Sequence, residues 1–177
     1  MSLLNSSIGK KLIMSISGVF LVLFLIFHMS MNIVAIFSGE AYNAICEFLG
    51  ANWYALVGTL ILAAGFLVHI LYATILTFQN QKARGTERYA CSDSPKTVEW
   101  ASQNMFVLGL IVVLGLLMHF LQFWAKMQFA EITENISSIG APADGAAFIK
   151  YWFSNPIYCG LYLVWFVALW FHLTHGF

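Results

Sequence analysis

Four long stretches without a charged side chain constrain this sequence more than any other feature. A membrane-spanning helix needs about 20 apolar residues, so a stretch of up to about 35 residues holds one span and not two. The uncharged stretches contain 28, 34, 26 and 27 residues and cover 12–39, 48–81, 100–125 and 151–177. We therefore predict four spanning helices, at 12–37, 53–78, 101–125 and 156–177.

Composition agrees with a chain that is nearly all membrane domain. Of 177 residues, 60% are hydrophobic and 9% are charged, whereas about a quarter of a soluble domain is charged. This excludes a disordered chain, a basic protein that binds nucleic acid and an ordinary soluble enzyme. The apolar run at 21–27 does not alternate with polar residues, which argues against a membrane β-barrel. We expect an all-α transmembrane helical bundle, a single domain over 1–177.

The basic residues predict the orientation of this bundle. Cytoplasmic segments of membrane proteins are enriched in Lys and Arg. Six basic residues precede the first span or lie between the second and third: Lys10, Lys11, Lys82, Arg84, Arg88 and Lys96. The opposite side has Lys126 and Lys150 among five acidic residues. We predict a multi-pass protein whose N-terminus and 79–100 loop are cytoplasmic.

Each predicted span contains a histidine, and their depths form pairs. Ionisable residues in a membrane are costly and usually functional, although a single histidine can equally serve an interhelical hydrogen bond. At about 1.5 Å per residue, His28 and His119 lie about 26–28 Å from the cytoplasmic edge. His69 and His172 lie about 24 Å from the opposite edge. The depths predict two facing pairs, His28 with His119 and His69 with His172.

Two facing pairs are what two bis-histidine haems need, one axial nitrogen on each side of each iron. A small residue one turn before the histidine would leave room for such a group, and Gly65, Gly115 and Ala168 fit this pattern. Phe24, before His28, does not. A single zinc or copper cluster would not have two depths, and a proton relay would normally include acidic residues inside the spans. His175 remains an alternative to His172.

The sequence resembles the di-haem cytochrome b membrane-anchor subunit of succinate dehydrogenases and fumarate reductases over nearly its whole length. The resemblance includes the four histidines, the opening segments 7–11 (SIGKK) and 14–18 (MSISG), the 101–105 stretch (ASQNM) and the ending at 172–176 (HLTHG). In the family's fourth-helix motif the first histidine is the ligand, which favours His172 over His175. The family pairs the first helix with the third and the second with the fourth, as the depths do.

The resemblance implies a function in electron transfer. His28 and His119 would bind the iron of an outer haem b, and His69 and His172 that of an inner one. Ser15 matches a family position near the inner haem's propionates. The anchor would sit in a bacterial-type inner (cytoplasmic) membrane and dock an iron–sulfur subunit and a flavoprotein on the cytoplasmic side. It would pass electrons to or from a membrane quinone, usually menaquinone, while the dicarboxylate chemistry takes place in the flavoprotein.

Two features depart from the family. The family normally has five helices and four are predicted here, which implies a truncated chain or a divergent short form. Some members also carry a proton-transferring Glu two residues before the fourth ligand, where this chain has Trp170. Two other functions remain open: the di-haem b anchor of a formate dehydrogenase or hydrogenase, and a haem-free membrane assembly or transport protein.

Overall fold

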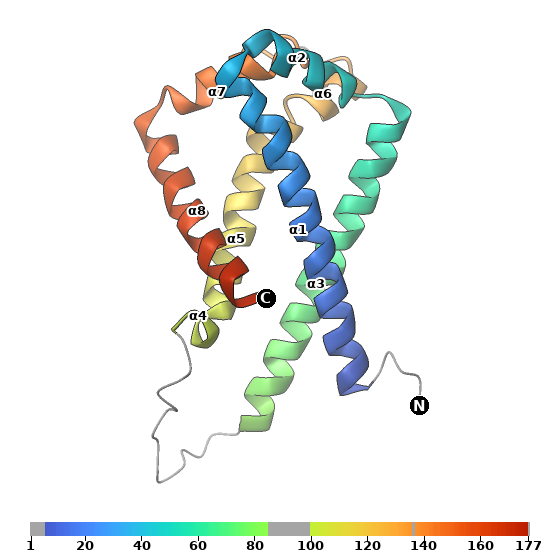
Figure 1. Cartoon of the computed structure of the whole chain (residues 1–177), viewed down its shortest axis with the longest axis vertical. Helices are drawn as coiled ribbons and strands as arrows, with labels where there is room; N and C mark the ends of the chain where they lie inside the picture. Colours follow the sequence, from blue (N-terminus) through green and yellow to red (C-terminus); the bar gives the residue numbers. More distant parts are fainter. Residues whose placement is uncertain (1–5, 85–99, 136, 177) are drawn as a thin grey trace.

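Four long apolar helices dominate the computed structural model of the chain (Figure 1). Residues 6–84, 100–135 and 137–176 are described, without the side chains of Arg84 and His175. The long helices are α1 (Ser7–Phe37), α3 (Trp53–Arg84), α5 (Met105–His119) and α8 (Pro156–Gly176). A π-helical turn, η2 (Phe120–Trp124), continues α5 and completes its span. No strand occurs in the described residues, so the predicted all-α, multi-pass membrane protein is confirmed.

The spanning helices are arranged as two antiparallel hairpins (Figure 1). The helix α1 packs along α3, and α5 packs along α8. Close backbone contacts between one hairpin and the other are few by comparison. Buried hydrophobic residues are accordingly scarce, and the only cluster of them in the described residues belongs to the second hairpin: Ala101, Leu108 and Ala168. The helices within each hairpin therefore approach closely along their backbones, whereas the spanning helices of different hairpins meet mainly through side chains.

Short helices close one end of the bundle, which we call the capped end (Figure 1). They are α2 (Gly39–Phe48), α6 (Gln128–Ile132) and α7 (Gly145–Phe153). Ser38 forms the corner between α1 and α2: its extended backbone ends α1, and its hydroxyl accepts a hydrogen bond from the N–H of Ala41 at 3.1 Å. The helix α2 forms most of the 39–52 connection, and α6 and α7 lie within the 127–155 segment.

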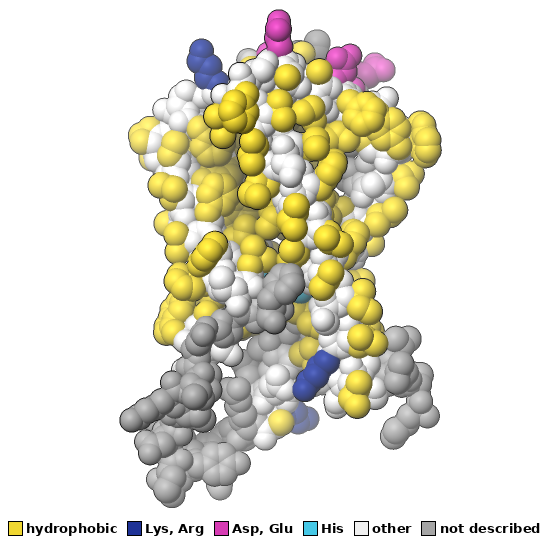
Figure 2. All heavy atoms as spheres, in the orientation of Figure 1, with side chains coloured by type: hydrophobic (Ala, Val, Ile, Leu, Met, Phe, Trp, Pro, Cys, Tyr) yellow, Lys and Arg dark blue, Asp and Glu magenta, His cyan; other side chains and the backbone are white. Residues whose placement is uncertain are grey.

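The opposite end holds the start of α1, the end of α3 and the short helix α4 (Trp100–Gln103). The Lys10 ammonium donates a hydrogen bond to the side-chain oxygen of Gln79 at 3.5 Å, which brings α1 and α3 together there. Figure 2 shows acidic side chains at the capped end, dark blue Lys and Arg at both ends, and a hydrophobic surface between them. This apolar belt is what lipid requires of a spanning bundle.

Candidate functional site

His28 on α1 and His119 at the end of α5 lie side by side between the two hairpins. Their ring centroids are 5.8 Å apart and the ring planes are inclined by 84°. The ring of Phe24, one turn earlier on α1, stacks against His28 with a centroid distance of 5.4 Å. The structure thus brings together the two histidines for which sequence depth predicted one level.

His69 on α3 and His172 on α8 form the second pair. Their centroids are 6.4 Å apart and the planes are inclined by 73°. Both pairs connect the first hairpin to the second, although the helices within each hairpin make the closer backbone contacts. Each of the four spanning helices therefore contributes one histidine, and these histidines form two pairs, as predicted.

Gly18 and Gly109 contact His69 and His172, the two histidines farther from the capped end, in the same way. A Cβ atom on Gly18 of α1 would lie 3.5 Å from Cε1 and 3.9 Å from Nδ1 of His69. A Cβ on Gly109 of α5 would lie at the same two distances from Cε1 and Nδ1 of His172. His28 follows Gly18 by ten residues and His119 follows Gly109 by ten. At 1.5 Å per residue, the two pairs are about 15 Å apart along the bundle.

The His119 imidazole is surrounded by aromatic rings and reaches a buried hydrogen-bond network. Phe123 lies 5.1 Å from it and Trp165 lies 5.7 Å from it, centroid to centroid. The His119 Nδ1 atom is 3.3 Å from the Tyr162 hydroxyl, which donates to Oε1 of Gln122 at 2.9 Å. Sequence reasoning missed Tyr162 and Gln122 because both positions fit an apolar spanning helix equally well.

Gln122 lies buried in the π-helical turn η2, three residues after His119. A π-helix inserts one residue into the α-helical repeat, and such turns are frequent at functional sites. Gln122 is 5% exposed, and its backbone carbonyl accepts a hydrogen bond from the Trp152 indole of α7 at 3.1 Å. The turn directly after His119 is thereby joined to the capped end.

The Ser17 hydroxyl contacts the His69 ring, and this contact is separate from the position near the inner haem's propionates that the family resemblance gave Ser15. The Ser17 hydroxyl is buried, donates to the Met14 carbonyl at 3.0 Å and lies 3.1 Å from Nδ1 of His69. Ser15 is exposed. Ser17 precedes Gly18, the close-contact position on α1, and the MSISG segment was the available signal for it.

His172 lacks the corresponding partner. Its Nδ1 atom is buried and makes no hydrogen bond, although buried polar atoms are normally paired. The residue before Gly109, in the place of Ser17, is the buried Leu108. The side chain of His175 lies outside the described residues, as do the side chain of Arg84 and all of Arg88 and Lys96.

The sequence predicted free space beside the small residue one turn before a histidine. Aromatic rings fill this space at Gly65 and Gly115. A Cβ on Gly65 would meet the ring of Phe20, and one on Gly115 would meet the ring of Trp165. The small residues therefore bring a neighbouring helix close, which is the usual use of glycine between membrane helices.

The spacing of both pairs is compatible with a group held by one nitrogen from each ring, and it is equally the spacing of two rings in direct contact. A metal–imidazole bond is about 2 Å long and the ring centroid lies about 1 Å behind the nitrogen, so two imidazoles that shared one metal ion would have centroids up to about 6 Å apart. The measured 5.8 and 6.4 Å agree with this spacing. Within the described part of the chain, no three or more His, Cys, Asp or Glu side chains come close enough to hold a metal ion.

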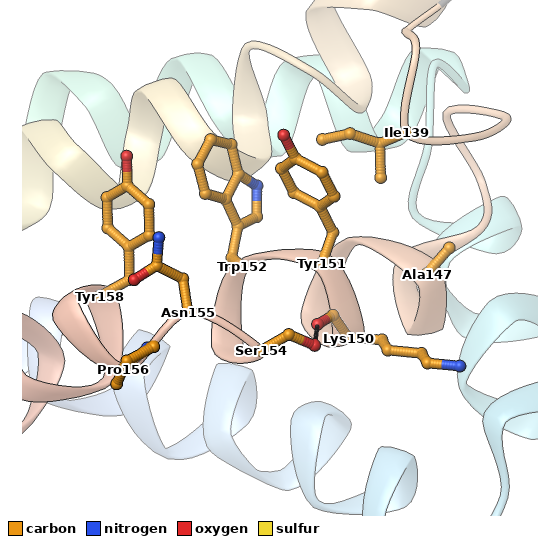
Figure 3. Close-up of a pocket in the computed structure, with 9 residues that line it drawn as sticks. All are labelled: Ile139, Ala147, Lys150, Tyr151, Trp152, Ser154, Asn155, Pro156 and Tyr158. Carbon is orange, nitrogen blue, oxygen red and sulfur yellow. Dashed lines mark hydrogen bonds between the residues drawn. The ribbon is translucent and has the colours of Figure 1, made fainter.

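A cavity of about 1010 Å³ lies at the capped end where α7 meets α8 (Figure 3). Its lining combines aromatic rings with polar groups: Tyr151, Trp152 and Tyr158 beside Lys150, Ser154 and Asn155. The cavity is separate from both histidine pairs in its lining.

No protein-family model, curated protein or solved structure matches this chain. The arrangement of the histidines is therefore the main basis for a functional proposal.

Proposed function

We propose that this protein is a di-haem cytochrome b membrane anchor that relays electrons between an iron–sulfur partner and a membrane quinone. The observation that carries the proposal is the pairing of four intramembrane histidines from four spanning helices, at centroid distances of 5.8 and 6.4 Å. A structural role for one histidine is common, but two facing pairs about 15 Å apart along the bundle form a repeated arrangement.

The residues of the chain would hold, orient and insulate the two groups. His28 and His119 would be the ligands nearer the capped end, and His69 and His172 the ligands of the second group. When bound, haem supplies one-electron redox chemistry, and the protein sets its potential through ligands, hydrogen bonds and burial. Close backbone contacts between the hairpins are few, and a flat group would have to displace rings that now lie at the pairs, among them Phe24, Phe123 and Trp165.

The direction of the bundle in the membrane belongs to the same proposal. Lys10, Lys11 and Lys82 lie at the end opposite the cap, and the positive-inside rule makes that end cytoplasmic. The iron–sulfur subunit, with its flavoprotein, would dock there, near the His69–His172 pair. Quinone, menaquinone in most members of the resembled family, would exchange electrons near the outer pair. We propose that the anchor itself does no dicarboxylate chemistry, and that the membrane is a bacterial-type inner membrane.

A dithionite-reduced minus air-oxidised spectrum of the purified complex tests the proposal. We expect a b-type α band and, by pyridine haemochrome, two haems per chain. His28→Ala and His172→Ala should each lose at least one haem. His175→Ala, which removes the alternative fourth-helix histidine, is the comparison and should keep both haems. A folded, membrane-inserted preparation without the α band would refute the proposal.

The subunits that co-purify with the chain distinguish the partner enzyme. A flavoprotein with succinate–fumarate activity would support the proposed complex. Formate dehydrogenase or hydrogenase activity in the same preparation would assign the di-haem module to one of those enzymes instead.

A further inference from the structure

Each histidine pair contains one imidazole that is held by a hydroxyl group, and the hydroxyl proton is already used elsewhere. The Ser17 hydroxyl donates to the Met14 carbonyl, and the Tyr162 hydroxyl donates to the Gln122 side chain. While its proton stays in that bond, each of these oxygens accepts from the histidine beside it. In that arrangement the N–H groups of His69 and His119 are at Nδ1, at 3.1 and 3.3 Å from the two oxygens.

We propose that Ser17 and Tyr162 are positioning residues that fix His69 and His119 in the tautomer with a free Nε2. This inference rests on the proposed function, since a free Nε2 is what a metal ligand presents. Histidine ligands commonly donate their other N–H to an acceptor, which fixes the ring and raises its basicity. Gln122 acts on His119 indirectly, because it accepts the hydrogen bond that orients the Tyr162 hydroxyl.

The arrangement makes each pair unequal. His172 lies against Gly109 as His69 lies against Gly18, yet Leu108 stands where the first hairpin has Ser17. The buried Nδ1 of His172 is left without a partner. In the His69–His172 pair, the hydrogen-bonded ring is therefore His69. A substitution at Leu108 can give His172 a hydroxyl partner as well.

The test is the midpoint potential of each haem in the purified complex, measured by redox titration of the b-type spectrum. Loss of the acceptor makes the imidazole a weaker donor, which favours ferrous iron and raises the potential. Ser17→Ala should raise only the potential of the His69–His172 haem, and Tyr162→Phe only that of the other. If the preference for ferric over ferrous iron falls by up to tenfold, the midpoint potential rises by up to about 59 mV for a one-electron couple.

Leu108→Ser should shift the midpoint potential in the opposite direction. It introduces a hydroxyl beside the unpaired Nδ1 of His172, in the place that Ser17 takes beside His69. We expect it to lower the potential of the same haem that Ser17→Ala raises. A merely structural role for Ser17 would not predict this reversal.

Two variants serve as matched controls. Ser30→Ala removes another hydroxyl from α1, one that bonds the Ile26 carbonyl at 2.8 Å, and Tyr158→Phe removes another phenol from α8. Both should leave the two potentials and the haem content unchanged. If the wild type contains two b haems and Ser17→Ala and Tyr162→Phe shift neither potential, the positioning role is overturned while the proposed function stands. A wild type without b haem overturns both.

Discussion

The imidazole of His172 lies directly against the backbone of Gly109, where a Cβ would be 3.5 Å from Cε1 of the ring. Such a distance is ordinary van der Waals contact, so a methyl group fits at this position and larger side chains do not. The same relationship joins His69 to Gly18 in the other hairpin. Each glycine thus sets how far its histidine can approach the neighbouring helix.

Substitutions at Gly109 should follow this size limit. We expect Gly109→Ala to keep two haems per chain, and Gly109→Val to lose the haem of the His69–His172 pair because the added methyl groups displace the imidazole. Pyridine haemochrome quantitation of the purified variants measures the difference. Gly160→Val on α8 is the control, since nothing lies within 4 Å of a Cβ there. Two haems in Gly109→Val would contradict the expected displacement.

The spanning helices and the pairing of their histidines could be predicted from the sequence because lipid imposes strict rules. Charged residues end a span, and helical rise converts sequence distance into depth. The four predicted spans are confirmed, with α1 and α3 extending several residues beyond the expected ends at the end opposite the cap. The paired histidines are found in contact distance, while their role as haem ligands stays a prediction.

The residues around the histidines could not be predicted in this way. A helical repeat places Gln122 near the face of His119, but its hydrogen bonds with Tyr162 and Trp152 depend on how α8 and α7 pack against that face. Ser17 and Ser15 differ only in which side of α1 they occupy, which depends on how α3 packs. Polar groups at the capped end are likewise paired by tertiary contacts between α2 and α7 that lie about a hundred residues apart in sequence.

A methyl group at Gly115 should destabilise the second hairpin. Its Cβ would meet the Trp165 ring at Cγ and Cδ1, near the base of the side chain, so Trp165 must move. The move would break the hydrogen bond from the Trp165 indole to the Val112 carbonyl at 3.0 Å. We expect Gly115→Ala to lower the free energy of unfolding in mixed micelles by about 1–3 kcal/mol.

Two comparisons isolate the steric cause. Gly58→Ala on α3, where a Cβ meets nothing within 4 Å, should instead stabilise the protein by about 0.5–1 kcal/mol. In a Trp165→Leu background, Gly115→Ala should lose most of its cost. An equal cost in both backgrounds would show that Trp165 is not the group that the methyl displaces.

The docking of α7 onto α2 depends on one pair of polar side chains. The Asn43 amide donates to the Asp144 carboxylate at 2.8 Å and accepts from the N–H of Ala146 at 3.0 Å. The carboxylate also caps α7 by accepting from the N–H of Ala147 at 3.1 Å. We expect Asn43→Ala and Asp144→Ala each to cost about 1 kcal/mol of unfolding free energy.

A double-mutant cycle tests whether these two residues act together. Because they share one hydrogen bond, the double variant should cost less than the sum of the single variants. Asn52→Ala, which removes an exposed amide bonded to the carbonyls of Glu47 and Phe48, is the control and should be additive with Asp144→Ala. Strict additivity of Asn43→Ala with Asp144→Ala would contradict the shared contact.

The thiol of Cys46 on α2 should react slowly with alkylating reagents at neutral pH. Burial raises the pKa of Cys46, because it disfavours the charged thiolate. Hydrogen bonds with Tyr42 and with the backbone of Gly145 lower the pKa in part, and the negative charge of Asp144 raises it by a smaller amount. The thiolate is the reactive form, so the rate should rise with pH only above the range of a free thiol, whose pKa is about 8.5. We expect the iodoacetamide rate profile of a Cys91→Ser, Cys159→Ser background to show this upward displacement.

Asp144→Asn should move the profile to lower pH by removing the neighbouring charge, whereas Glu40→Gln, at the start of α2, should leave it in place. A Cys46 profile that coincides with that of a free thiol would contradict the packing of α7 over Cys46.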